Sequence, residues 1–220
     1  MTPFSDPQAA ERYLEGLVRM VPGLAHLHRM TSLILAERVG DEGRVLVLGA
    51  GGGLELKAFA EEHPGWLFDG VDPSAEMLAL AARTLGPLAS RVRFHKGIID
   101  VAPTGPFDGA TCLLTLHFLP RAERLRTLVE VRRRLAPGAP FVVAHHSFPQ
   151  DPAGKARWLG RFAAASGMPI EQARNAAAGV GARLPAVASE EDEALLREAG
   201  FTDVELFYAA FTFRGWVAYG

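Results

Sequence analysis

A glycine-rich turn and a later aspartate are the residues whose types and spacing point most directly to chemistry. Three glycines, Gly49, Gly51 and Gly53, follow an apolar run and open a segment with helical spacing. Without side chains in the way, the backbone N–H groups of such a turn can approach a ligand, and the helix N-terminus adds a positive field. Asp72 ends the next apolar run, where a carboxylate can accept hydrogen bonds from two ribose hydroxyls. Together they predict a nucleoside site.

The spacing of the glycines separates two classes of nucleoside cofactor. A dinucleotide site follows a G-x-G-x-x-G pattern, whose third glycine would fall at position 54, and that position is Leu54. The G-x-G-x-G spacing of this chain favours a single nucleoside that carries an amino-acid tail. A glycine-rich turn that binds nothing is the alternative, and the combination of strand, glycines, helix and distal acid disfavours it.

Three histidines are candidate catalytic bases. His117 follows the predicted fourth strand, and His145 and His146 follow the fifth. The carboxyl ends of parallel strands form the ligand-binding edge of an open α/β sheet, so an imidazole there can take a proton from an acceptor. The alternative is that they are core histidines without a catalytic role. We expect no metal, because no carboxylate or further histidine lies beside them at ligand spacing.

Alternating apolar runs and helical segments must position these residues. Strands are predicted at 45–48, 66–71, 92–94, 110–115 and 141–144, and helices in 7–39 and at 54–63, from 72, 121–135, 152–166 and 170–179. This alternation predicts right-handed βαβ units and a parallel sheet with helices on both faces. A last helix is expected over 189–199 with Ser189 as its cap. The runs 204–213 and 216–219 predict an antiparallel hairpin that turns near Arg214-Gly215.

Composition limits the class of protein. The chain has 220 residues, 49% of them hydrophobic, with a mean hydropathy of +0.10, which excludes a disordered chain. A net charge of −2 disfavours nucleic acid as a partner, and no apolar run is as long as a membrane span. The single cysteine, Cys112, excludes an internal disulfide and a cysteine-rich zinc site. The N-terminus lacks a signal-peptide pattern, so we expect a cytoplasmic protein.

These motifs resemble those of the class I S-adenosylmethionine-dependent methyltransferases. The segments that carry the resemblance are VLVLGAGGG (45–53), GVDPSAEMLALA (70–81), FDGATCLLTLHFLP (107–120) and 125–143. The resemblance implies an α/β, Rossmann-like fold, with a seven-stranded sheet in the order 3-2-1-4-5-7-6 and an antiparallel last strand. It also implies S-adenosylmethionine as the cofactor and S-adenosylhomocysteine as the product.

The resemblance further implies which residues hold the cofactor. The loop 49–53 is expected at its amino-acid end, Asp72 at the ribose and Asp100 at the adenine. The complete expected set is Gly49, Ala50, Gly51, Gly53, Asp72, Pro73, Asp100 and Leu114. One position departs from the family. Two residues before the first glycine, where the family usually has an acid, this chain has Val47.

A closer likeness is to the carboxy-S-adenosylmethionine synthases, which use prephenate as carboxyl donor. VPGL near residue 21, TLHFLPRAER at 115–124 and the ending FYAAFTFRGWVA follow that layout. In that family an arginine in an I-x-Q-x-R stretch binds the added carboxylate, and IEQAR places Arg174 on the pattern. Leu24 stands where those enzymes have tyrosine and Leu113 where they have asparagine. These departures favour ordinary methyl transfer.

We therefore expect a methyltransferase that acts on an O or N atom of a small molecule, since the chain has neither a basic field nor an appended RNA-binding module. The alternatives are a carboxy-S-adenosylmethionine synthase and a non-catalytic cofactor-binding protein. Arg174, Tyr208 and Trp216 are the candidate substrate-binding residues, and a solvated helix position is the alternative for Arg174.

The same pattern predicts one domain over residues 1–220. Its expected parts are N-terminal helices (1–40), a cofactor-binding core (41–149), a helical cap (150–188), and a last helix with an edge hairpin (189–220). The surplus segments, 1–40 and 150–188, are too short to bury cores of their own. We expect both to close over the carboxyl edge of the sheet. The aromatic edge hairpin would allow a homodimer.

Overall fold

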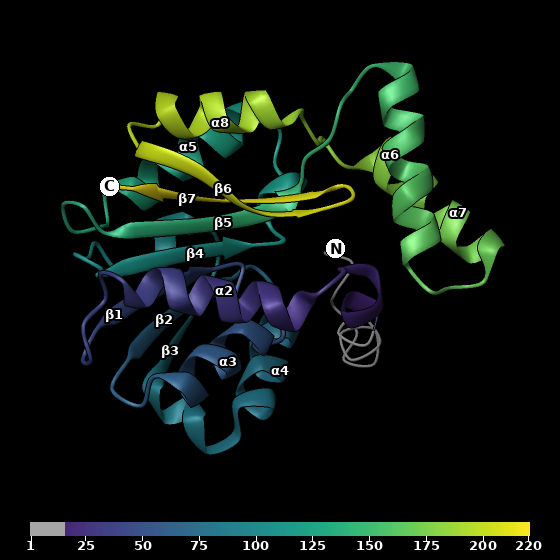
Figure 1. Ribbon diagram of the computed structural model, residues 1–220. Coiled ribbons are helices and arrows are strands. Elements are labelled where there is room, and N and C mark those ends of the chain that lie inside the picture. Colours follow the sequence, from purple (N-terminus) through teal and green to yellow (C-terminus); the bar gives the residue numbers. More distant parts are fainter. Residues whose placement is uncertain (1–15) are drawn as a thin grey trace.

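Seven strands form one sheet in residues 16–220, the part of the chain that the computed structural model describes (Figure 1). The strands are β1 (Arg44–Leu48), β2 (Leu67–Asp72), β3 (Val92–Lys96), β4 (Gly109–Leu113), β5 (Pro140–His146), β6 (Thr202–Ala210) and β7 (Phe213–Tyr219). The α-helices are α2 (Leu24–Ala36), α3 (Leu54–Glu62), α4 (Ala75–Leu85), α5 (Arg121–Arg132), α6 (Pro152–Ala165), α7 (Ile170–Arg183) and α8 (Ser189–Glu198). Short 3₁₀ helices lie at Gly86–Arg91, Ile99–Val101 and Leu116–Phe118.

The strand order is β3-β2-β1-β4-β5-β7-β6, which confirms the predicted order. β1 lies between β2 and β4 and is parallel to both, whereas β7 is antiparallel to β5 and to β6. Strand order therefore reverses beside β1, and ligands of open α/β sheets bind outside the carboxyl ends of the strands at such a point. The predicted binding edge is in place.

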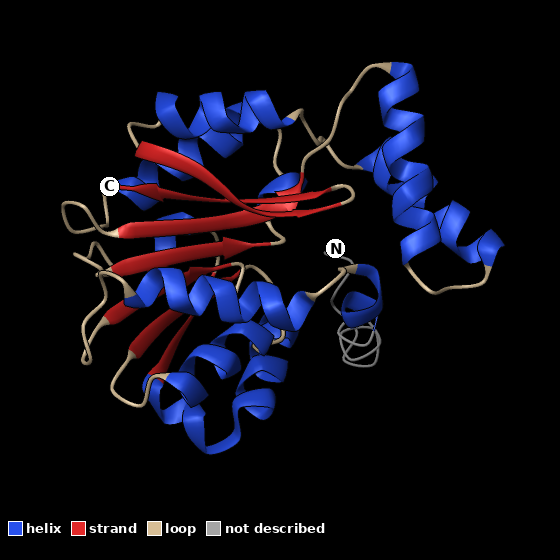
Figure 2. Ribbon diagram, viewed as in Figure 1, coloured by secondary structure: helices blue, strands red, loops and turns tan. Residues whose placement is uncertain are grey.

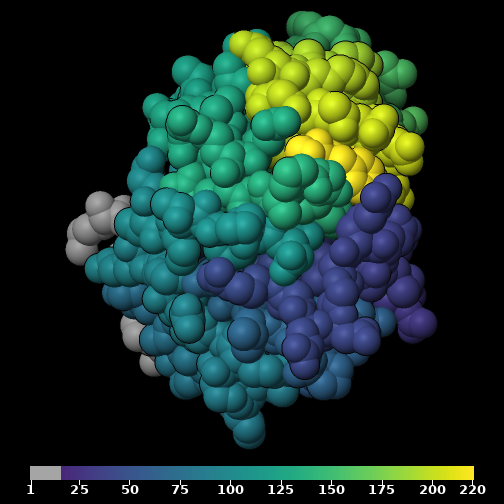
Figure 3. Space-filling model, turned by 90° about the vertical axis from the view of Figure 1, so that its left-hand side faces the viewer, coloured from purple at the N-terminus to yellow at the C-terminus, as the bar shows by residue number. Residues whose placement is uncertain are grey.

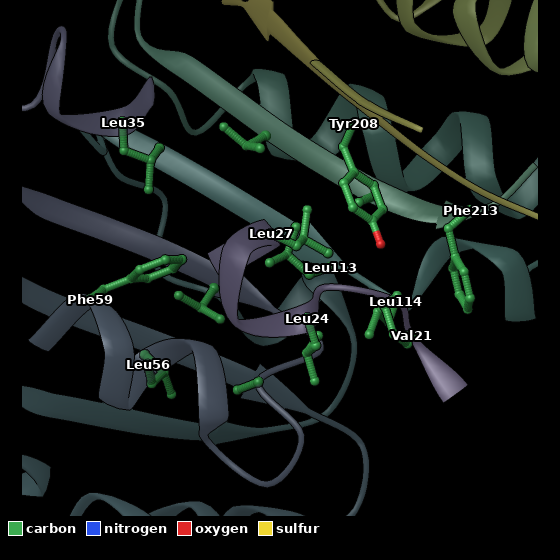
Figure 4. Close-up of a cluster of buried hydrophobic side chains, with 14 of the residues drawn as sticks. Val21, Leu24, Leu27, Leu35, Leu56, Phe59, Leu113, Leu114, Tyr208 and Phe213 are labelled. Carbon is green, nitrogen blue, oxygen red and sulfur yellow. The ribbon is translucent and has the colours of Figure 1, made fainter. Parts of the chain in front are cut away.

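Each central strand is apolar on both sides because helices cover both faces of the sheet (Figure 2). In β1, Val45 and Val47 belong to the cluster under α2, α3 and α4, whereas Leu46 and Leu48 belong to the cluster under α5 and α8. Figure 4 shows the first cluster, in which leucines of α2 lie near the residues at the end of β4. These two cores fix the level and direction of the strand ends.

The C-terminal hairpin has the predicted antiparallel pairing, but its turn is displaced. We predicted the turn near Arg214-Gly215, whereas β6 ends at Ala210 and the turn is Phe211-Thr212. Phe211 has φ 52°, a conformation usually left to glycine, and Gly215 lies within β7 opposite Tyr208. The sequence prediction was wrong because it took a glycine as the turn signal, and Gly215 instead makes room for Phe207 and Ala144.

The N-terminus of α8 also differs from the prediction. The helix starts at Ser189, so Ala188 is the capping residue and no side-chain hydrogen bond caps it. Ser189 was therefore wrongly expected as the cap. Three acids, Glu190, Glu191 and Asp192, stand in the first turn, where they interact favourably with the helix dipole.

Helices α6 and α7 form a pair beyond the carboxyl end of the sheet, to the right in Figure 1. Phe162 of α6 is 1% exposed and attaches this pair to the sheet. Its ring centroid lies 5.4 Å from that of His146 and 6.0 Å from that of Phe213. The predicted helices at 152–166 and 170–179 are thus present, and α6 contacts the end of β5 and the start of β7.

Of the two helices expected in 7–39, most of the first lies outside the described residues. Residues 16–20 are helical, Pro22-Gly23 interrupts the chain as predicted, and α2 follows. Figure 3 looks onto the opposite end of the molecule, at the amino ends of the parallel strands, where the backbone of Gly220 bonds to Gly138 and Ala139. No helix within residues 16–220 is long and apolar enough to span a membrane.

Candidate functional site

A cavity of about 350 Å³ lies at the carboxyl ends of β1, β2 and β4. This volume is in the range of small-molecule sites, and its exposed lining is mainly apolar. Of the residues predicted to contact a cofactor, those that line it are Gly49, Ala50, Gly51, Gly53, Asp72, Pro73 and Leu114. Asp100 lies outside the lining. The sequence-predicted loop and acid are therefore brought together in one cavity.

The loop between β1 and α3 needs its glycines. Gly49, Gly51 and Gly53 have φ values of 77°, 49° and 81°, which residues with side chains rarely adopt. An added Cβ at Gly49 would lie 1.9 Å from Thr115 Oγ1, and one at Gly53 would lie 2.8 Å from Ala81 Cα. The backbone N–H groups of Gly49 and Ala50 donate to Val71 O at 2.8 and 2.9 Å, so the loop is fixed against β2.

Asp72 connects this loop to the start of α4. Its Oδ2 accepts from the N–H of Gly51 at 3.0 Å, and its Oδ1 accepts from the N–H of Ser74 at 2.9 Å. Burial raises the pKa of Asp72, and these two bonds oppose that shift. The carboxylate is thus held in a fixed orientation at the cavity wall, with lone pairs left for a ligand's hydroxyls.

Glu55 is a buried carboxyl in the same cavity, and sequence reasoning missed it. It is the second residue of α3 and only 8% exposed. Its Oε1 accepts a hydrogen bond from Thr111 Oγ1 of β4 at 2.9 Å. Burial raises the pKa of Glu55 to about 8, so the free protein holds it mainly protonated at neutral pH.

The far end of the cavity is apolar and closed by an ion pair. Ile98 and Ile99 line it after β3, at the position where the resemblance expected the adenine. Asp100 is exposed, and its two carboxylate oxygens lie 2.9 and 3.2 Å from Nη1 of Arg126. Arg126 lines the cavity and also bonds to Glu123 at 3.1 Å. Asp100 is thereby already paired at the rim.

Leu114 and Thr115 form the cavity wall after β4. Leu114 has φ 56°, and its N–H donates to Ala144 O at 2.5 Å. This strained backbone turns the chain away from the sheet and brings Thr115 against Gly49. Phe118, which is 48% exposed, continues the lining towards the opening.

Among the described residues, His28 of α2 is the histidine that lines the cavity. It is 7% exposed, and burial lowers its pKa to about 4, so its imidazole is neutral at neutral pH. Sequence reasoning missed it because it lies on the buried face of α2 with Leu24, Leu27 and Thr31, a pattern that reads as core. Only the tertiary position of α2 exposes it to a ligand.

The three predicted catalytic histidines meet, but they do not line the cavity. The N–H of His146 donates to Nδ1 of His117 at 3.1 Å, and their ring centroids lie 4.9 Å apart. His145 points towards α8, where its Nε2 lies 3.1 Å from Oδ1 of Asp192. Burial is the main cause that lowers the pKa of His117 well below its usual value and that of His146 to about 3.

Asp192 also bonds to Arg124 at 2.5 Å, so this cluster joins α5 to α8. Burial alone would raise the pKa of Asp192, but His145 and Arg124 bring it below its usual value. Removing one partner of such a buried ion pair would leave an uncompensated charge and destabilise the fold. The cluster of His145, Asp192 and Arg124 is therefore explained by its role in packing α8 against α5 and the sheet.

The three predicted substrate-binding residues lie apart from one another. Arg174 is exposed on α7. The Tyr208 hydroxyl donates to Pro22 O at 2.5 Å, and Nε1 of Trp216 donates to Glu193 Oε1 at 3.3 Å. None of the three lines the cavity. Within residues 16–220, no three His, Cys, Asp or Glu side chains are grouped as a metal site.

Comparisons with known proteins show similarity to methyltransferases. A family model described as a methyltransferase domain matches residues 46–141, which contain the glycine loop, Asp72, the whole of β2, β3 and β4, and parts of β1 and β5. Trans-aconitate 2-methyltransferase of Streptomyces avermitilis is 32% identical over 135 residues, covering 56% of this chain and 49% of that protein. The chain thus spans about half the length of this relative.

Two further comparisons cover nearly the whole chain. Carboxy-S-adenosyl-L-methionine synthase of Glaesserella parasuis serovar 5 is 25% identical over 218 residues, 94% of this chain and 89% of that enzyme. The structure of human N-acetylserotonin methyltransferase in complex with SAM has a TM-score of 0.67 at 16% identity, covering 98% of this chain and 57% of that one. At this identity the likeness concerns the fold.

Proposed function

We propose that this chain is a class I S-adenosylmethionine-dependent methyltransferase, that its cavity binds S-adenosylmethionine and that it methylates an O or N atom of a small molecule. One observation carries the proposal. The loop Gly49–Gly53 and the carboxylate of Asp72 meet at one cavity at the reversal point of the sheet. A nucleoside with an amino-acid tail fits both its polar end and its apolar end.

The residues of this chain divide the proposed cofactor site into three parts. The loop 49–53 would lie against the amino-acid end, and Asp72 would accept hydrogen bonds from the ribose hydroxyls. Ile98 and Ile99 would pack on the adenine, and the Arg126–Asp100 pair would close that end. A role for Asp100 as a direct contact of the adenine stays a prediction.

When bound, S-adenosylmethionine supplies a methyl group already activated by its positive sulfur. The protein then has to align the acceptor and exclude water. Leu17 and Phe118 are placed to shield the opening, and neutral His28 is placed to take the proton of a hydroxyl acceptor. We expect His28→Gln to lower the rate of S-adenosylhomocysteine formation without weakening S-adenosylhomocysteine binding.

The lining also bears on the acceptor. Glu55, Asp72 and Glu123 contribute carboxyl groups, whereas Arg126 is the arginine among the described lining residues and is already paired. A polycarboxylate such as trans-aconitate, named in the Streptomyces relative, would find no unpaired arginine or lysine among the described residues of the lining. We therefore propose a neutral, largely apolar acceptor. S-adenosylhomocysteine formation with tricarboxylic acids but not with neutral phenols would contradict this choice.

A carboxy-S-adenosylmethionine synthase is the second candidate, favoured by the length of the match to the Glaesserella enzyme. That activity would need a cation at the added carboxylate, and Arg174 was predicted to supply it. Arg174 is exposed on α7, outside the cavity lining. Its position supports methyl transfer as the better proposal.

The cofactor site is tested by calorimetric titration of the purified full chain with S-adenosylmethionine. We expect Asp72→Asn to weaken binding by roughly tenfold or more, because an amide offers one acceptor oxygen in place of two. Asp203→Asn, an exposed position on β6, is the matched control and should bind as the unsubstituted protein does. Binding of NAD in place of S-adenosylmethionine would refute the proposal.

A further inference from the structure

We propose that the carboxylate of Glu55 binds the α-ammonium group of the cofactor's amino-acid end. The inference rests on the proposed function, because it assigns a residue to one end of the cofactor site. It concerns a carboxyl supplied by α3, in place of the acid that β1 lacks.

The position of Val47 excludes it from any polar role. It is fully buried in β1 and belongs to the apolar cluster under α2, α3 and α4. Its register partner in β4 is Thr111. Register partners of a parallel pair present their side chains on the same face, so the Thr111 hydroxyl lies beside Val47 on the α3 side of the sheet.

Glu55 approaches Thr111 and Val47 from α3, which covers this face of the sheet. It follows the glycine loop directly, at the second position of α3, and Thr111 Oγ1 donates to its Oε1 at 2.9 Å. This bond fixes the carboxyl next to Val47 and leaves Oε2 as the oxygen for a ligand. A carboxyl from the helix thus takes the place that a strand residue leaves apolar.

The surroundings of Glu55 call for a cation. Buried carboxylates are normally paired, yet among residues 16–220 no Lys, Arg or His forms an ion pair with Glu55. The other two carboxyls of the lining are already engaged, Asp72 by the N–H groups of the loop and Glu123 by Arg126. A ligand's ammonium group would supply the missing charge to Glu55.

The other titratable groups near Glu55 do not supply that charge. The Cys112 thiol of β4 stays protonated, because burial raises its pKa, and Glu55 itself adds to that effect. His28, on the α2 side of the cavity, is neutral since burial lowers its pKa to about 4. Asp72 is an acid. Since none of the described residues supplies the positive charge, we expect the cation to arrive with the ligand.

The test compares two probes on the full chain by isothermal titration calorimetry. S-adenosylhomocysteine carries the ammonium group, whereas 5′-methylthioadenosine has the same nucleoside and sulfur without the amino-acid end. We expect Glu55→Gln, which keeps the size and the Thr111 bond, to weaken S-adenosylhomocysteine binding by at least roughly tenfold. Its affinity for 5′-methylthioadenosine should stay within about twofold.

Glu62→Gln is the matched control, because Glu62 is exposed at the other end of α3, and it should change neither affinity. Equal weakening of both probes by Glu55→Gln would reduce Glu55 to a structural role, and unchanged S-adenosylhomocysteine binding would also overturn the inference. If the unsubstituted protein bound neither probe, the proposed function itself would fail.

A second measurement does not depend on how well the variant folds. The unsubstituted protein is titrated with the analogue of S-adenosylhomocysteine in which hydrogen replaces the α-amino group. We expect it to bind at least roughly tenfold more weakly than S-adenosylhomocysteine. Equal affinities would overturn the assignment of Glu55.

Discussion

Two buried carboxyls of the cavity differ in what they already bind, and this difference decides their proposed roles. Asp72 accepts two backbone N–H bonds, which hold it as a fixed acceptor for neutral hydroxyls. Glu55 accepts one bond from a threonine hydroxyl and has no charged partner among the described residues. Burial raises the pKa of Glu55 to about 8, and only the hydrogen bond from Thr111 opposes that shift. Asp72 is therefore suited to bind the ribose hydroxyls, and Glu55 is suited to bind an ammonium group.

Proton release follows from the Glu55 assignment. At pH 7 a carboxyl with a pKa of about 8 is mostly protonated, and an arriving ammonium group favours the carboxylate, so binding releases a proton. Affinity for S-adenosylhomocysteine should therefore rise between pH 6 and 8, by up to about tenfold per pH unit. His28 and Cys112 keep their protonation states across this range, since their pKa values lie well below and well above it.

Calorimetry at pH 7 in phosphate and in Tris measures this release, because the two buffers take up protons with different enthalpies. The unsubstituted protein should show a buffer-dependent binding enthalpy, and Glu55→Gln should show much less. The same buffer dependence in both proteins would assign the proton to another group.

Residues that act through local sequence could be predicted, and those that act through distant contacts could not. The glycines and Asp72 could be identified from the sequence because they follow apolar runs that predict strands. The orientation of the Glu55 carboxyl depends on a hydrogen bond from Thr111, which is 56 positions away in the sequence. His28 lines the cavity only because of where α2 packs. The three histidines after β4 and β5 lie at the predicted edge, but His146 packs against α6, His145 contacts α8, and His117 accepts a hydrogen bond from the backbone of His146.

At the scale of elements, the loop between β1 and α3 is the most constrained segment of the cavity. It is fixed to β2 by Val71 O, to β4 by the contact of Gly49 with Thr115, and to α4 by Gly53 against Ala81. Strand and helix runs predicted these elements well, because burial on both faces makes their apolar pattern continuous. The turn of the last hairpin failed as a prediction because Phe211, and no glycine, adopts the left-handed conformation there.

Gly49→Ala tests this constraint. An alanine would have to adopt φ 77° and would place its Cβ against Thr115, so we expect loss of S-adenosylhomocysteine binding and a fall in the free energy of unfolding of more than about 1 kcal/mol. Gly86→Ala is the control, since Gly86 has φ 56° but open space around it. It should show the backbone cost alone and bind normally. Normal binding by Gly49→Ala would contradict the account of the loop, as measured by urea unfolding and calorimetry.

At the scale of the molecule, the two surplus segments take different positions relative to the cavity. The N-terminal part contributes Leu17 and His28 to the lining. The pair α6–α7 lies beyond the same end of the sheet, yet none of its residues lines the cavity. We therefore propose that the N-terminal segment covers the acceptor directly and that α6–α7 supports the edge through Phe162. The domain boundaries and the homodimer stay predictions.

Native mass spectrometry of the purified full chain, with and without added S-adenosylmethionine, tests the central claim most directly. We predict a one-to-one adduct with the mass of S-adenosylmethionine or S-adenosylhomocysteine, and conversion of the first into the second when an acceptor is supplied. An adduct heavier by one carboxyl group would indicate the synthase activity instead. Binding of NAD, with no S-adenosylmethionine adduct, would contradict the account.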